Sequence, residues 1–92
     1  MPLKDAFPDL SSVDLQATQW QVALDGDFQR RLVWESEVVT DGRWAVRVGP
    51  VDGRFCGQMK GSVLLDLDSE YAWQARFRTA KGWSYWSRPI PF

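Results

Sequence analysis

The carboxyl-terminal third of the sequence combines arginine and tryptophan residues at spacings that would let their side chains stack. Arg76 and Arg78 are separated by one residue, and Trp83 and Trp86 follow within the segment GWSYWSRP. On a β-strand, two such arginines share one face of the sheet and lie about 7 Å apart. If the next strand returns across that face, each guanidinium can stack on an indole, at about 0.5–2 kcal/mol per contact. We therefore expect a stabilising ladder here.

A serine follows each of these tryptophans, and its hydroxyl group can bond backbone groups of the neighbouring strand. The expected structural ladder comprises Arg76, Arg78, Trp83, Ser84, Trp86 and Ser87. The alternative is a carbohydrate-binding platform on Trp83, Trp86 or Tyr85, because sugars stack on flat aromatic rings. Interleaved arginines would cover the ring faces that a sugar needs, so the structural interpretation is favoured.

Other chemically capable residues favour structural roles. Glu35 and Glu37 would share one strand face, whereas glycosidase carboxylates usually face each other across a cleft. The acidic run 66–70 lacks the twelve-residue spacing and central glycine of a calcium loop. Cys56 is the only cysteine and histidine is absent, so a small buried side chain is expected rather than a nucleophile. We predict no catalytic, cofactor-binding or metal-binding residues, and no enzyme.

The charge and the cysteine content exclude further classes of protein. Eleven basic and twelve acidic residues give a formal net charge of −1, which argues against nucleic-acid binding through a basic face. One cysteine allows no internal disulfide. No apolar run is long enough for a signal peptide or a membrane span, so no membrane partner is expected.

Turn signals and alternating hydrophobicity predict an all-β fold. Glycine after aspartate or lysine marks turns roughly every 8–15 residues. Between them, apolar and polar residues alternate over residues 18–24, 31–39, 43–48 and 71–79, and residues 62–67 are a short apolar run. The alternation places four tryptophans in the core: Trp20, Trp34, Trp44 and Trp73. The similar segments VTDGRW and PVDGRF are interpreted as two matching hairpin turns.

The strand around Trp34 is apolar on both faces, as expected for burial on two sides or for a subunit contact. The candidate interface therefore consists of Val33, Trp34 and Val39. The first ten residues, with two prolines and mixed charges, are expected to form an irregular N-terminal arm, and residues 11–92 the folded domain. The segment before Trp20 is too short for two full strands, and an open sheet edge there would let another chain pair.

The segment LDLDSEYAWQARFRTAKGWSYWSRPIPF resembles the last two strands of a fibronectin type III domain. Tyr71 falls where that family has a corner tyrosine whose hydroxyl bonds back to the chain, although Leu67 replaces the usual proline. Residues 83–87 fit a Trp-Ser-x-Trp-Ser box. The upstream segment ATQWQVALDGDFQRRLVWESEVV is similar to the subtype of bacterial and tailed-phage proteins. The resemblance implies an immunoglobulin-like β-sandwich of about seven antiparallel strands.

The resemblance, together with a chain that has no leader and no disulfide, predicts a non-catalytic structural protein of a bacteriophage particle, either a tail or a head-decoration protein. Its partners would be other protein subunits in a symmetric oligomer. The expected location is the virion or the host cytoplasm. The alternative is a carbohydrate-binding or enzyme-accessory module of a larger bacterial protein.

Overall fold

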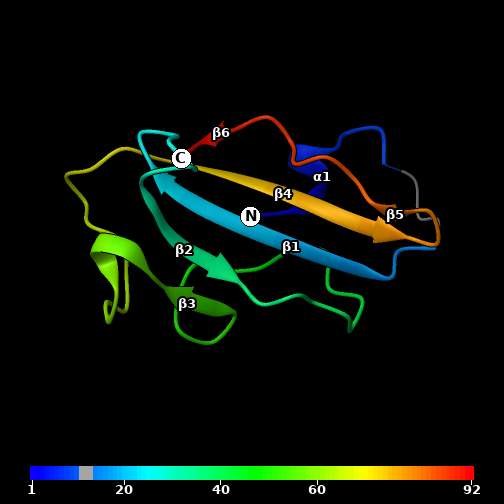
Figure 1. Ribbon diagram of the computed structural model, residues 1–92, viewed down its shortest axis with the longest axis horizontal. Coiled ribbons are helices and arrows are strands. Elements are labelled where there is room, and N and C mark those ends of the chain that lie inside the picture. Colours follow the sequence, from blue (N-terminus) through cyan, green and yellow to red (C-terminus); the bar gives the residue numbers. More distant parts are fainter. Residues whose placement is uncertain (11–13) are drawn as a thin grey trace.

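The computed structural model describes residues 1–10 and 14–92, and its main feature is one antiparallel β-sheet (Figure 1). In chain order, the elements are α1 (Leu3–Ala6), β1 (Ala17–Leu24), β2 (Leu32–Ser36), β3 (Gly53–Phe55), the 3₁₀ helix η1 (Gly57–Met59), β4 (Tyr71–Thr79), β5 (Gly82–Trp83) and β6 (Ile90–Pro91). The strand order is β3-β2-β1-β4-β5, and β6 also pairs with β4. The predicted β-rich antiparallel fold is confirmed.

The two long central strands bury one face of the sheet. In the pairing of β1 with β4, Trp20 lies opposite Ala75 and Val22 lies opposite Trp73. Because side chains alternate along a strand, these residues share one face, and all four are buried. The alternation in the sequence therefore predicted both strands, and the predicted core positions of Trp20 and Trp73 are confirmed.

The N-terminal arm and the long loops cover this buried face. Leu3 is completely buried, and its N–H donates to the carbonyl of Trp44 at 2.7 Å. An isolated bridge between Pro2 and Ala45 fixes the arm further. The arm was predicted to be irregular, but it contains α1 and contributes to the core. The predicted domain boundary falls at residue 11, which lies outside the described residues.

The strands of the described residues form one sheet, where the sequence predicted two. Within the described residues, the sheet has six strands, whereas about seven in two sheets were expected. Residues 43–48 and 62–67 form no strand. The predicted burial of Trp44 is wrong, since 39% of its surface is exposed. The reason is that contacts of its neighbours Arg43 and Ala45 hold the segment as a loop, from which Val46 reaches the core.

Two local features fix the ends of β4. Its last residue, Thr79, pairs with Gly82 across a two-residue turn, and Gly82 has φ +110°, a conformation that side-chain-bearing residues rarely adopt. At its first residue, the hydroxyl of Tyr71 accepts a hydrogen bond from the N–H of Asp66 at 3.0 Å. The hydroxyl thus ties the preceding loop to the sheet.

Candidate functional site

Arginine and tryptophan side chains stack on the outer face of β4. The guanidinium of Arg76 lies 4.4 Å from the ring centroid of Trp83 and 4.6 Å from that of Trp86. Arg78 lies 5.5 Å from the ring of Trp83, with which it is also paired in the sheet. Arg76 therefore lies between two indoles, and the structure brings together the four side chains that the sequence singled out.

The two serines attach the C-terminal segment to β4 by a repeated pattern of hydrogen bonds. The Ser84 N–H donates to the carbonyl of Phe77 at 2.7 Å, and the Phe77 N–H donates back to the Ser84 hydroxyl at 3.1 Å. Ser87 makes the same pair of bonds with Ala75, at 2.8 and 3.0 Å. Each hydroxyl therefore replaces a backbone carbonyl where no regular strand is formed.

Glutamines on β1 extend the ladder, and the sequence analysis missed them. The side-chain oxygen of Gln19 accepts two hydrogen bonds from Arg76, at 2.7 and 3.0 Å, and Gln74 donates to Gln21 at 2.9 Å. The alternation of residues 18–24 places both β1 glutamines on one face. The sequence pattern does not give the register between β1 and β4, and this register places Gln19 opposite Arg76.

The replacement Arg76→Ala is expected to lower the free energy of unfolding by about 1–3 kcal/mol, because two cation–π contacts and the bonds to Gln19 are lost. Urea denaturation followed by circular dichroism measures this, because Arg76 stacks on two of the tryptophans that would report by fluorescence. Arg76→Lys keeps the charge but not the planar fork, so an intermediate loss is expected. The matched control is Arg88→Ala on the exposed neighbouring segment, with a change below about 0.5 kcal/mol. Equal stability of the two alanine variants would contradict a structural role of the ladder.

The candidate interface at Val33, Trp34 and Val39 lies in the core. Val33 and Trp34 are completely buried, and Val39 is 5% exposed. Trp34 packs on the inner face, and its indole N–H donates to the carbonyl of Gly49 at 3.0 Å. The prediction of an interface at these three side chains is therefore wrong, because they are buried within the chain itself.

The remaining chemically capable side chains mostly make internal contacts. Glu35 accepts a hydrogen bond from Arg54 at 3.0 Å across β2 and β3. The thiol of Cys56 is half-buried, and this desolvation raises its pKa, which disfavours the reactive thiolate. In the part of the chain that the structure describes, no group of three or more His, Cys, Asp or Glu side chains is placed to hold a metal ion.

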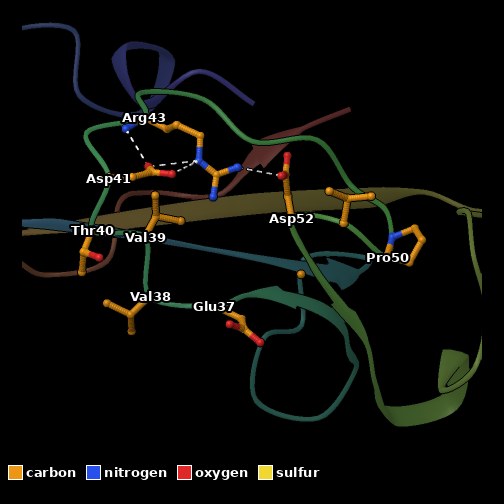
Figure 2. A pocket seen from close by; sticks show the side chains of 10 residues that line it. Glu37, Val38, Val39, Thr40, Asp41, Arg43, Pro50 and Asp52 are labelled. Atoms are coloured by element: carbon orange, nitrogen blue, oxygen red, sulfur yellow. Dashed lines mark hydrogen bonds and ion pairs between the residues drawn. The ribbon is translucent and has the colours of Figure 1, made fainter.

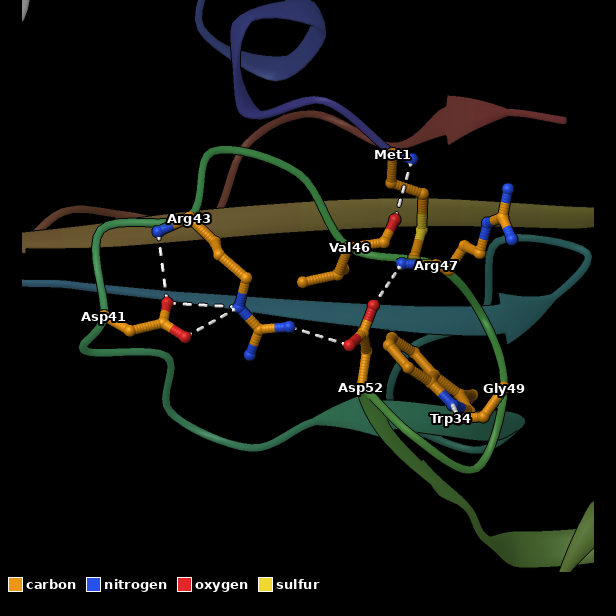
Figure 3. A network of polar contacts seen from close by, with 8 residues as sticks. All are labelled: Met1, Trp34, Asp41, Arg43, Val46, Arg47, Gly49 and Asp52. Carbon is orange, nitrogen blue, oxygen red and sulfur yellow. Dashed lines mark hydrogen bonds and ion pairs between the residues drawn. The ribbon is translucent and has the colours of Figure 1, made fainter.

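A network of charged residues organises the long loop between β2 and β3 (Figure 3). The guanidinium of Arg43 lies between two carboxylates, 3.0 Å from Asp41 and 2.7 Å from Asp52. Asp52 also accepts a bond from the backbone N–H of Arg47 at 2.9 Å. The two similar Asp-Gly-Arg segments of the sequence therefore meet in space. The repeat was the feature of the sequence that pointed to the network. From the sequence, the repeat was interpreted only as two matching turns.

The hydrogen bond from the Arg47 N–H, together with the Arg43 guanidinium, holds the pKa of Asp52 below its ordinary value of 3.8. A lowered pKa stabilises the fold above the ordinary pKa, and this contribution is lost as the pH falls through the lowered value. Asp52→Asn should therefore be less stable than the parent chain at pH 7. The difference should shrink below about pH 4. Urea midpoints at pH 7 and pH 3 measure it, and a pH-independent difference would refute the expectation.

Comparisons with known proteins found no matching family model, no matching curated protein and no matching solved structure. None of the helices formed by the described residues is long and apolar enough to cross a membrane.

Proposed function

We propose that this chain is a fibronectin type III-like domain and a non-catalytic structural protein of a bacteriophage particle. It would act in the tail or as a head decoration and attach to other protein subunits. The family part of the proposal is supported by the bonds of Ser84 and Ser87 to β4 and by the Tyr71 hydroxyl at the start of that strand. In this interpretation, the sheet is one layer of a sandwich, and the arm and loops form the other.

The observation that carries the interaction role is the exposure of large hydrophobic side chains on the loop before β3 and on the loop between η1 and β4. Val51 is 93% exposed and Leu67 is fully exposed, and Val63 and Leu64 are also exposed. Val51 and Val63 line one shallow cavity together. Neighbouring exposed apolar side chains, as Val51 and Val63 are, are typical of surfaces that another protein covers.

A non-catalytic role is supported by the internal contacts of the charged and aromatic residues. Arg76 is engaged by two indoles and Gln19, and Glu35 by Arg54. The assignment to a phage particle rests on the resemblance of residues 17–92 to fibronectin-like domains of tailed phages and bacteria. Many weak contacts repeated in a symmetric assembly would give tight attachment.

The alternative function is a carbohydrate-binding or enzyme-accessory module. Tyr85 favours it, because this side chain is 94% exposed next to the two indoles and offers a flat ring to a sugar. The indoles themselves are less suited, since Arg76 already covers one face of each.

Two measurements on the purified chain distinguish the proposed functions. Light scattering and electron microscopy should show rings or other regular oligomers, or copies bound to a phage particle. Titration with oligosaccharides should leave the tryptophan fluorescence unchanged. A monomer that binds neither itself nor particles, but whose fluorescence is quenched by a glycan, would overturn the structural role in favour of the module.

A further inference from the structure

The β3 edge of the sheet is interrupted by a notch. Strand β2 ends at Ser36, whose hydroxyl accepts the hydrogen bond from the Trp20 N–H at 2.8 Å in place of a backbone carbonyl. The chain nevertheless continues beside β1, because Val39 exchanges two backbone bonds with Thr18 at 2.8 and 2.9 Å. Strand β3 does not follow: it begins only at Gly53. A cavity of about 290 Å³, here called the edge notch, separates residues 37–41 from residues 50–53 (Figure 2).

The edge notch exposes backbone groups that are free to pair. Among the described residues, Glu37 and Val38 take part in no backbone–backbone hydrogen bond. One side of this segment is already occupied by β1 through the bridge at Val39. On its other side, a strand added in line with β3 would pair with the N–H and C=O groups of every second residue of this segment, which is how extended peptides add to sheet edges.

The charge of the edge notch selects what can pair there. Three carboxylates line it, from Glu37, Asp41 and Asp52, against the single guanidinium of Arg43. Arg43 already makes ion pairs with both aspartates, whereas Glu37 is exposed and has no ion-pair partner among the described residues. A lysine or arginine of an added strand would complement this excess negative charge.

Apolar side chains form the rim of the edge notch. Val51 is almost fully exposed and Val38 is about half exposed. Neighbouring residues of an extended segment point to opposite faces, so Glu37 and Val38 would contact alternate residues of an added strand. The surface therefore fits a strand in which basic and branched apolar residues alternate.

The edge notch is formed before any partner arrives. Asp52 is fixed by the Arg47 N–H and by Arg43, and Gly49 accepts the hydrogen bond of the buried Trp34 indole. These contacts hold the loop that forms one wall. A preformed site reduces the entropy that binding would otherwise cost.

We infer that the edge notch binds an extended segment of a partner protein, with alternating basic and apolar residues, by strand addition. The inference rests on the proposed function and deepens it, because it names the surface of attachment and the chemistry of the partner.

The test uses the whole chain labelled with ¹⁵N and a capped hexapeptide in which lysine and valine alternate. Saturable amide shifts are expected at residues 37–41 and 51–55, and a peptide with glutamate in place of lysine should produce none. Glu37→Lys should weaken binding roughly tenfold, since one charge pair becomes a repulsion. Val51→Ser should weaken it severalfold. The matched control is Glu70→Lys, an exposed carboxylate outside the edge notch, which should bind as the parent chain does.

Shifts outside the edge notch, or equal binding by Glu37→Lys and Glu70→Lys, would overturn the inference. So would self-association that Glu37→Lys abolishes, because the occupant would then be a second copy of the chain. If Glu37→Lys still assembles with other subunits or particles as the parent chain does, the edge notch is not the surface of attachment while the structural role stands. If the chain joins no assembly but still binds the peptide here, the structural role fails and the edge notch remains a peptide site.

Discussion

Replacing Trp34 by alanine is expected to lower the free energy of unfolding by about 3–5 kcal/mol, a large share of the stability of a domain of this size. The side chain is completely buried between the sheet and the loop that follows β2. The substitution removes its packing and leaves the carbonyl of Gly49 without its hydrogen bond. Urea denaturation followed by circular dichroism measures the effect, because the other five tryptophans complicate the fluorescence signal.

Trp44→Ala is the matched control for this replacement. The same indole is removed from a position that is 39% exposed, so a loss of about 1 kcal/mol or less is expected. The comparison of the two variants also distinguishes a core position of Trp34 from the interface position predicted from the sequence. An interface residue would affect assembly and leave the stability of the single chain unchanged. Equal losses for the two variants would therefore contradict the core position of Trp34.

The sequence predicts those parts of the fold in which the local pattern decides the structure. Apolar residues occupy every second position of β1 from Trp20 to Leu24 and of β4 from Tyr71 to Phe77. Since both faces of these strands are defined by alternation alone, the core positions of Trp20 and Trp73 followed directly. The spacing of Arg76, Trp83 and Trp86 likewise indicated the ladder, because only one neighbouring strand is needed to form it.

The parts that were not predicted depend on contacts between distant segments. Apolar and polar residues alternate over residues 43–48 as in a strand. In the structure, however, Arg43 bonds to Asp52, and the N-terminal arm pairs with this segment at Ala45, where a neighbouring strand would have to pair. Trp44 is exposed as a consequence. The edge notch could not be predicted for a similar reason. The edge notch exists only because the backbone bonding of β2 to β1 is interrupted at Ser36, and because β3 begins at Gly53, which is paired with Ser36.

Gly53→Ala is expected to destabilise the chain by about 3 kcal/mol, although the backbone of this glycine lies outside the left-handed region. A Cβ atom at this position would lie 2.5 Å from the Trp34 ring and 2.8 Å from the Cα of Ser36, and it would contact the carbonyl oxygen of Glu35. Two of these three neighbours are backbone atoms of the paired strand, so the clash is relieved only if β3 moves away from β2. Thermal or urea denaturation measures the loss.

Gly42→Ala separates this steric effect from backbone strain. Gly42 has φ +83°, and no atom lies within 4 Å of the position that an added methyl group would take, so strain alone should cost about 1 kcal/mol. If close packing matters more than conformational freedom, Gly53→Ala must be the more damaging of the two. Gly53→Ala should also shift the amide resonances of Glu37 and Val38, because the position at which β3 begins determines where the edge notch opens. A larger loss for Gly42→Ala would show that β3 and β2 are not in such close contact.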